Sequence, residues 1–420
     1  MNNSELNLEV KKTIQKKLLG KKLSYREIFD LMDEIAHNRL GDVLTTYFVA
    51  ASFKEGFAPD ELYHFTKAMV ETGERLHFKG IVADKHSIGG LAGTRATMII
   101  VPIVTSAGFT MPKISSRAIT SPAGTADVME VLAPVEFKIP ELEEIVHHTG
   151  GCICWNGHLG IAPADDIIIR VEEPLSFEAF DKVIVSILAK HVAAGSTHLI
   201  LDLPIGHTMK IRHEKDAMGV LHKFQRLGKQ FGINIIGNIE HTLEPSGNGV
   251  GPVLEAIDVL KVLEQQPDRP CNLEKRALHL TGELLNLCYK DSREKKDGHA
   301  VAKQILTSGT ALQKFKDIIL AQGGNPKITS SGLKIHAKSK TILAPYKGIV
   351  RSINNYNLNS VAKLLGAPAD KNAGLYLHKK IGTTFEKLEP LVTLYSKSDY
   401  HLREAQDTLK TFPLLHVEAL

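Results

Sequence analysis

The chain has 420 residues, 43% of them hydrophobic and 23% charged, a composition typical of globular proteins rather than of disordered or fibrous ones. Its net charge of +4 is too small to indicate a nucleic-acid partner but is compatible with an anionic small substrate. The longest apolar run, residues 98–109, is too short to cross a membrane, and four cysteines do not make a disulfide framework. We therefore expect a cytoplasmic protein of two or three domains.

Residues 1–72 predict a helical lobe. Val10, Ile14 and Leu18 recur at helical spacing, so the lysines around them are predicted to form the solvated face of a helix. Ser24 and Glu27 make the pattern of a capping box ahead of a second helix.

Residues 78–330 predict an α/β domain. Short runs typical of β-strands alternate with longer helical stretches, which predicts a mixed or parallel sheet wrapped by helices. The runs fall at residues 80–83, 112–115, 151–155, 198–206 and 233–239. A helix predicted at 176–195 interrupts the series and is expected to pack back on the helical lobe. Residues 331–420 alternate in polarity and turn at glycines, which predicts a small C-terminal β-rich α+β domain.

The stretch "DKHSIGGLAGTRAT", residues 84–97, is predicted to be a turn between a strand and a helix. Lys85 supplies charge, Ser87 a hydroxyl group, and Gly89 and Gly90 a close backbone approach, while the following helix directs its amide groups at the same point. The glycine spacing fits neither the dinucleotide fingerprint nor the nucleoside-triphosphate loop. The turn therefore indicates free phosphate or a single phosphoryl group, with a plain tight turn as the alternative.

A second turn, residues 115–127, follows the next predicted strand and combines four hydroxyl side chains with Arg117 and Gly124. Hydroxyl-rich loops are commonly just solvent-facing. Two adjacent βα turns that can both bind anions nevertheless mark the carboxyl edge of a parallel sheet, where such folds place their ligands.

A predicted helix carries Glu178, Lys182, Ser186 and Lys190 at intervals of four residues, so these side chains share one face. Arg170 stands just before, at the end of the strand-like run 166–170. A solvated stripe stabilised by helix salt bridges is the alternative to a binding surface.

Two motifs together resemble those of the thymidine and pyrimidine nucleoside phosphorylases, a family that includes the AMP phosphorylases. They are K-H-S-x-G-G at residues 85–90, and S-x-R followed by G-T at residues 115–125. The resemblance extends from about residue 7 to the C-terminus, and the stretches 115–134 and 162–176 place the chain nearest the branch of the AMP phosphorylases and their thymidine phosphorylase relatives.

The resemblance implies a set of site residues. Phosphate would be held by Lys85, Ser87, Gly89, Gly90, Thr97, Ser115 and Thr125. The rest of the substrate would be held by Ser116, Arg117, Ala118, Ile119, Thr120, Ser121, Arg170, Ser186, Lys190 and Lys210. Catalysis would fall to Arg170 and Lys190, which stabilise the departing base, and to His86 or Glu178 as general acid.

The reaction implied is phosphorolysis of a pyrimidine nucleoside or deoxynucleoside, with inorganic phosphate as co-substrate and no cofactor. AMP is the alternative substrate. Glu178 stands where the AMP enzymes carry an aspartate, and the N-terminal β-domain usual in that branch has no counterpart in these residues, so it is expected to be dispensable or to have been removed. We expect a homodimer or higher homo-oligomer with neither a nucleic-acid nor a membrane partner.

Two other classes are weighed against this one. An enzyme like anthranilate phosphoribosyltransferase would need magnesium, for which Asp165, Asp166, Glu172 and Glu173 could be ligands, and a non-catalytic phosphate-binding protein is the third option. His147, His148, Cys152, Cys154 and His158 crowd into twelve residues. The C-x-C spacing is not that of structural zinc, and both cysteines are predicted on one face of a buried strand, so we predict no metal there.

Overall fold

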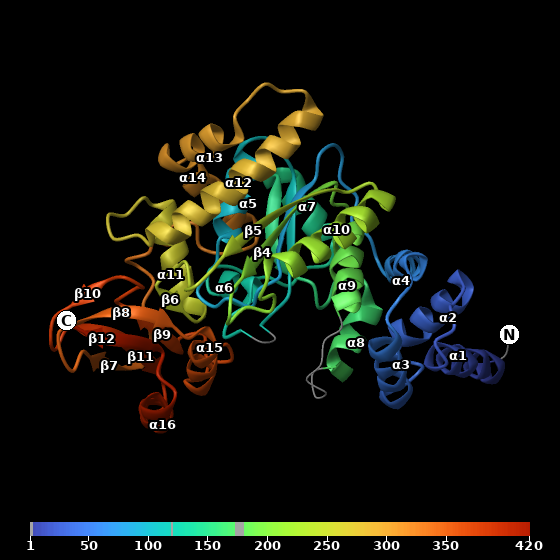
Figure 1. Cartoon of the computed structure of the whole chain (residues 1–420). Helices are drawn as coiled ribbons and strands as arrows, with labels where there is room; N and C mark the ends of the chain where they lie inside the picture. The colour runs from blue at the N-terminus through green and yellow to red at the C-terminus, as the bar shows by residue number, and fades with distance from the viewer. Residues whose placement is uncertain (1–2, 119–120, 173–179) are drawn as a thin grey trace. The chain divides into compact units, whose positions relative to one another are not determined.

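The structure is a computed structural model that describes residues 3–118, 121–172 and 180–420 (Figure 1). The chain forms two compact units that interleave along the sequence. The first unit comprises Met1–Val82, Asn156–Leu199 and Gly219–Ile235, and the second comprises Ala83–Trp155, Ile200–Met218 and Ile236–Leu420. Among the helices described, none is both long and apolar enough to span a membrane.

The first unit is a helical bundle, as predicted. Its helices are α1 (Asn3–Leu18), α2 (Tyr25–Ala36), α3 (Asp42–Glu55), α4 (Pro59–Glu71), α8 (Pro163–Glu172), α9 (Phe180–Ala193) and most of α10 (Glu214–Gln230). The capping box of α2 is confirmed, because the Glu27 amide donates to the Ser24 hydroxyl and the Ser24 amide donates to the Glu27 carboxylate. Helix α9 packs against α4, so a segment that begins 109 residues after the end of α4 completes the bundle begun by α1–α4.

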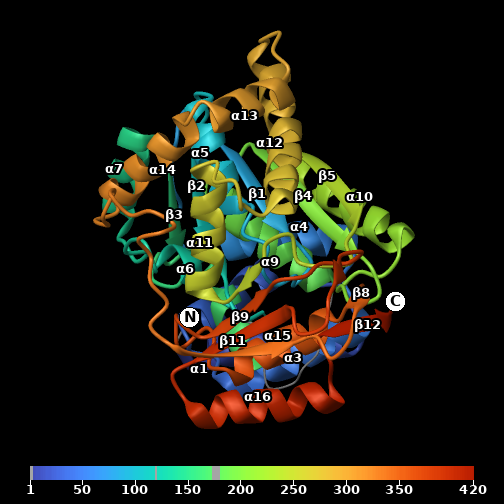
Figure 2. The same ribbon diagram turned by 90° about the vertical axis from the view of Figure 1, so that its left-hand side faces the viewer.

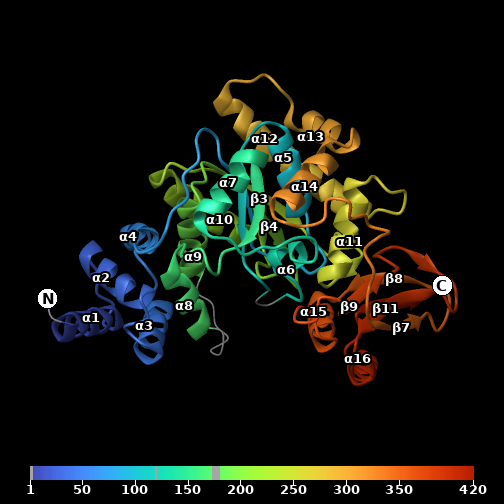
Figure 3. The same ribbon diagram turned by 180° about the vertical axis from the view of Figure 1, so that it is seen from behind.

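The α/β part of the second unit is built on short strands. Its elements are β1 (Ala83–Ser87), α5 (Thr97–Ser106), β2 (Met111–Ser115), α6 (Thr125–Met129), α7 (Ile139–Thr149), β3 (Gly151–Trp155), β4 (His198–Ile205), β5 (Asn234–His241), β6 (Gly249–Val250), α11 (Pro252–Leu263), α12 (Cys271–Ser292), α13 (Gly298–Thr307) and α14 (Thr310–Ala321). β1, β4 and β5 are adjacent in that order, and β2 pairs with β3 in parallel. Every residue of β4 is buried, as expected for a strand covered on both faces. Figure 3 shows α7 beside β3, and α14 packs against α7.

The C-terminal part is β-rich, as predicted, and Figure 2 shows its strands with α16 packed outside them. Its elements are β7 (Lys338–Leu343), β8 (Gly348–Ile353), α15 (Asn355–Leu364), β9 (Gly374–Leu377), β10 (Thr384–Phe385), β11 (Pro390–Ser396), α16 (Asp399–Thr411) and β12 (Leu415–Ala419). One sheet has the order β6-β9-β11-β7, so it takes in a strand from the α/β part. Gly374 has φ of 149°, and a Cβ there would lie 2.0 Å from the Val250 carbonyl oxygen, so only glycine permits this approach.

Two sequence predictions are corrected. The run 166–170 is not a strand but lies inside α8, which begins at Pro163 and carries Asp165 and Asp166 in its first turn, near the positive end of the helix dipole. Lys85 and Ser87 were expected in a turn but lie in β1. The strand ends at Ser87, four residues beyond Ala83, where the apolar run ends. The strand continues because the Ile88 amide still donates to the Asp202 carbonyl of β4.

Candidate active site

Lys85 and Ser87 share one partner, the carboxylate of Asp202 in β4. The Lys85 ammonium lies 3.5 Å from Asp202 Oδ2, and the Ser87 hydroxyl donates to the same oxygen at 3.0 Å. Arg276 of α12 donates to the other oxygen, Oδ1, at 2.6 Å. Because alternate residues of a strand face the same side, His86 belongs to the opposite face of β1. One buried carboxylate therefore orients two of the predicted phosphate ligands.

Buried charged groups of both signs surround Lys85. The pKa of its ammonium is lowered to about 8, chiefly by burial and also by the nearby cations of Arg276, Lys113 and Arg95, while Asp202 opposes this lowering. Burial would raise the pKa of Asp202, yet Lys85 and Arg276 hold it below its usual value. Lys113 pairs with Asp84, Arg95 with Glu255, and Arg276 with Asp202 and Glu240, so the groups around Lys85 form a buried network of ion pairs.

The glycines after β1 allow close packing rather than flexibility. A Cβ at Gly89 would lie 2.2 Å from Pro204 Cγ, and Gly90 has φ of 61°. Thr97, the first residue of α5, is buried at the helix N-terminus. The turn therefore has the tight geometry, and the helix start, that an anion-binding βα turn requires.

The second turn is held together by Asp127 of α6. Its Oδ2 accepts hydrogen bonds from the amides of Ala118 and Gly124, at 2.7 and 2.9 Å. Thr125 begins α6, and its hydroxyl accepts a hydrogen bond from Arg95 at 3.3 Å. Because the pKa of Lys85 responds to the same Arg95, both predicted anion turns lie within the field of one guanidinium.

The remaining residues of this turn are placed differently. Ser115 ends β2 and Ser116 is exposed, while the Ser121 hydroxyl donates to the Ala123 carbonyl at 3.0 Å. Ile119 and Thr120, predicted to contact substrate, lie outside the described residues.

Arg117, another predicted substrate ligand, is engaged by carboxylates of the protein. Its guanidinium donates two hydrogen bonds of 2.7 Å to Glu130 and one of 3.0 Å to Glu136, and it lies 4.6 Å from the centre of the Trp155 ring. Lys371 from the C-terminal part also contacts Glu130. These bonds raise the pKa of Arg117 and give it a role in fixing the turn.

The predicted base-binding residues lie in the first unit, on α8 and α9. Ser186 donates to Asp165 Oδ2 at 2.7 Å, and the Lys190 ammonium lies 2.7 Å from the same oxygen. Asp165 is completely buried, and although burial raises its pKa, Lys190 and Lys182 lower it below the usual value. Ser186 and Lys190 are therefore brought together, one helical turn apart, by Asp165, which the sequence suggests only as a possible magnesium ligand.

The other residues of this group are more dispersed. Arg170 is exposed at the end of α8 and donates to Asp42 at 2.6 Å. Glu172 pairs with Lys182, so it is neutralised by a lysine, as Asp165 is. Glu173 and the proposed general acid Glu178 lie outside the described residues. Lys210 is exposed in the turn that follows β4.

Sequence reasoning did not identify Asp202, Arg95 or Asp165 as parts of these sites. Asp202 is a lone carboxylate within the apolar run of β4, and a charged residue in such a run is a usable signal that it pairs with another charge.

The two cysteines predicted to lie in a buried strand do so. Cys152 and Cys154 are both buried in β3. The hydrogen bond with Cys154, together with burial, raises the pKa of Cys152, so it remains a thiol.

Comparison with known families covers most of the chain. Residues 11–73 match the helical bundle domain of a glycosyl transferase family, residues 79–312 match the a/b domain of that family, and residues 349–412 match the pyrimidine nucleoside phosphorylase C-terminal domain.

Individual relatives agree with these matches. The chain is 42% identical over 398 residues to a protein named "AMP phosphorylase" from Thermofilum pendens, covering 94% of this chain and 76% of that one. It is 40% identical over 404 residues to a protein named "Putative thymidine phosphorylase" from Legionella pneumophila, covering 96% and 77%. Anthranilate phosphoribosyltransferase from Thermus thermophilus has a similar structure, with a TM-score of 0.60 over 74% of this chain and 99% of that one. At 17% identity, the last likeness concerns the fold alone.

Proposed function

This chain belongs to the nucleoside phosphorylase family, and from that premise we propose that it cleaves a pyrimidine nucleoside or deoxynucleoside with inorganic phosphate. The products are the free base and ribose or deoxyribose 1-phosphate. A phosphate oxygen forms a bond to C1′, the C1′–N bond to the base breaks, and the base nitrogen is protonated. No cofactor is required for this exchange.

The Lys85 cluster, in which the buried side chains of Lys85 and Arg276 and the hydroxyl group of Ser87 converge on Asp202, is the observation that carries the proposal. Lys85, kept charged by Asp202, and the hydroxyl group of Ser87 supply charge and a hydrogen bond to phosphate, with Thr97 and Thr125 at the starts of two helices. A phosphate dianion held there can attack the sugar carbon and stabilise the positive charge that develops on it.

Departure of the base leaves negative charge on its ring. Lys190 is a suitable counter-charge, because Asp165 and Asp166 raise its pKa against the effect of burial and so keep the ammonium protonated. Ser186, one turn away on α9, can hydrogen-bond to the same base edge, and Arg170 is assigned to the base as well. The proton taken up by the base nitrogen is assigned to His86 or Glu178 as general acid.

AMP is the alternative substrate, and the exposed Lys210 favours it. A nucleoside 5′-monophosphate carries a second phosphate, which needs a cation away from the Lys85 cluster, and Lys210 and Ser121 are the candidates for that contact. Cleavage of AMP would release adenine and ribose 1,5-bisphosphate.

We propose a homodimer, with the first unit contributing the interface, in a reducing cytoplasmic compartment. Val43 and Tyr47 lie one turn apart on α3 and are 83% and 51% exposed, and Leu8 of α1 is 55% exposed. Exposed apolar side chains on neighbouring helices are typical of a protein interface. The four free cysteines are compatible with the compartment.

The test is a substrate panel of thymidine, uridine, AMP and CMP at equal phosphate, with released base as the readout. We expect thymidine or uridine to be cleaved most efficiently, and no release without phosphate. If AMP is preferred and Lys210→Ala removes that preference, the alternative stands. Activity lost on chelation and restored only by magnesium would contradict phosphorolysis and favour phosphoribosyl transfer.

A further inference from the structure

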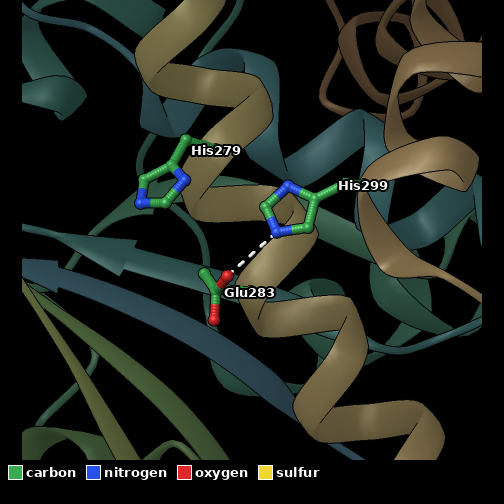
Figure 4. Close-up of side chains that lie close together, drawn as sticks. All are labelled: His279, Glu283 and His299. Atoms are coloured by element: carbon green, nitrogen blue, oxygen red, sulfur yellow. Dashed lines mark hydrogen bonds and ion pairs between the residues drawn. The ribbon is translucent and has the colours of Figure 1, made fainter.

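We infer that His279, Glu283 and His299 form a binding site for one divalent transition-metal ion of the zinc class, apart from the Lys85 cluster. Their donor atoms lie within 4.8 Å of one another. Figure 4 shows the three side chains turned toward one another between α12 and α13. Within residues 3–118, 121–172 and 180–420, this is the single group of three or more His, Cys, Asp and Glu side chains that could hold a metal ion.

Helix geometry supplies two of the three ligands. His279 and Glu283 are four residues apart on α12, so they project from the same face of the helix. His299 stands in the first turn of α13, with its Nε2 at 2.9 Å from Glu283 Oε1. The two imidazole rings lie 5.8 Å apart and are nearly parallel. The three donors therefore converge from two helices.

Two glycines, Gly282 and Gly298, allow His299 to pack closely against α12. A Cβ at Gly282 would lie 2.1 Å from His299 Nδ1, so the ring rests directly on the helix backbone at this position. Gly298 also approaches α12 closely, and its amide donates to Asn286 Oδ1 at 2.7 Å. Asp297 caps α13 by accepting the His299 amide hydrogen at 3.0 Å. The position of His299 is thus fixed by backbone contacts, independently of Glu283.

A hydrogen-bond chain sets the tautomer of His279. Asp202 can only accept, so the Asn238 side-chain amide directs its NH₂ to Asp202 Oδ1, at 3.4 Å. The Asn238 carbonyl oxygen then accepts from His279 Nε2 at 3.0 Å, which places the imidazole proton on Nε2. Nδ1 of His279 is left with the lone pair that a metal ion needs. A histidine ligand oriented by a second hydrogen bond is characteristic of metal sites in proteins.

The donor set selects the class of ion. Two imidazole nitrogens and one carboxylate are typical zinc ligands, whereas calcium and magnesium prefer oxygen donors. Tetrahedral binding at zinc–nitrogen distances brings donors to about 3.4 Å from one another, so the widest pair must close by rotation of a side chain. By the usual order of affinities, zinc and copper should bind more tightly than manganese.

The experiment is a titration of the untagged, chelator-stripped full chain with Zn²⁺ by calorimetry, and with Co²⁺ by visible absorption. We expect one Zn²⁺ per chain and a Co²⁺ spectrum of low coordination number. His279→Ala and His299→Ala should each weaken Zn²⁺ binding by more than about 100-fold. Circular dichroism checks that the variants are folded.

The chain offers a matched control and a variant that keeps every ligand. Glu144 and His148 are another exposed pair four residues apart on a helix, 3.9 Å from each other, and His148→Ala should leave Zn²⁺ affinity unchanged. Gly282→Ala adds the Cβ that displaces the His299 ring, and it should weaken binding by at least about 10-fold. Wild type that binds no Zn²⁺, or an affinity that falls with His148→Ala but not with His299→Ala, overturns the proposal.

Discussion

Lys85 shows how a single buried residue can make phosphate binding depend on pH. Its pKa is lowered to about 8 by burial and by neighbouring cations, with Asp202 acting in the opposite direction. The cationic form therefore predominates below about pH 8, makes up half of the population at that pH, and is lost as the pH rises further.

We predict that phosphate affinity, measured by calorimetry from pH 6.5 to 9.5, falls on the alkaline side near pH 8. Asp202→Asn removes the carboxylate that raises the Lys85 pKa, so the fall should move to lower pH. Asp268→Asn changes an exposed carboxylate paired with Lys261 and should leave the fall where it is. If phosphate affinity falls at the same pH in Asp202→Asn as in the wild type, a phosphate-binding role for charged Lys85 is contradicted.

Helices α8 and α9 form an element pair whose contact is electrostatic. Asp165 on α8 is completely buried and lies between Lys182 and Lys190 of α9. Removing one partner of a buried ion pair costs about 3–5 kcal/mol because the other charge is left uncompensated. Lys190 therefore stabilises the first unit in addition to its proposed part in the reaction.

These two roles can be separated by a double variant. Lys190→Met should lower the free energy of unfolding by about 3 kcal/mol and turnover by at least about 100-fold. Lys190→Met combined with Asp165→Asn removes the uncompensated charge, so stability should largely return while turnover stays low. Denaturant unfolding and steady-state kinetics measure the two effects. Recovery of turnover in the double variant would show that Lys190 acts only through stability.

Prediction from sequence succeeded for helices and strands that have local signals. It failed where contacts between residues far apart in the sequence determine the structure. The strands at 112–115 and 151–155 were found from short apolar runs between turn residues, and they lie within β2 and β3. The isoleucines of 166–170 favour a strand by propensity, but burial of Asp165 and Ile168 at helical spacing prevails in α8. Asp202 and Arg276 are 74 residues apart, and no local pattern predicts their contact.

At the scale of the whole molecule, the exposed apolar face of α3 predicts self-association. We expect Val43→Glu with Tyr47→Lys to convert the proposed dimer into a monomer, because both changes place charge in the proposed apolar interface. Light scattering coupled to size exclusion measures the mass. Phe412→Lys changes an apolar residue of similar exposure, 57%, in the C-terminal part and serves as the control. Wild type that elutes as a monomer would rule the interface out.

The pairing of β6 with β9 has a consequence for how this gene can be rearranged. A break between the α/β part and the C-terminal part would separate Gly249–Val250 from their neighbours in the sheet and expose the hydrogen-bonding edge of β9. It would also remove Lys380, whose ammonium donates to the carbonyls of Pro245 and Gly247, from the loop before β6. Recombination that joins the C-terminal part to a different catalytic part must therefore bring a compatible strand with it, so the two parts are expected to be inherited together.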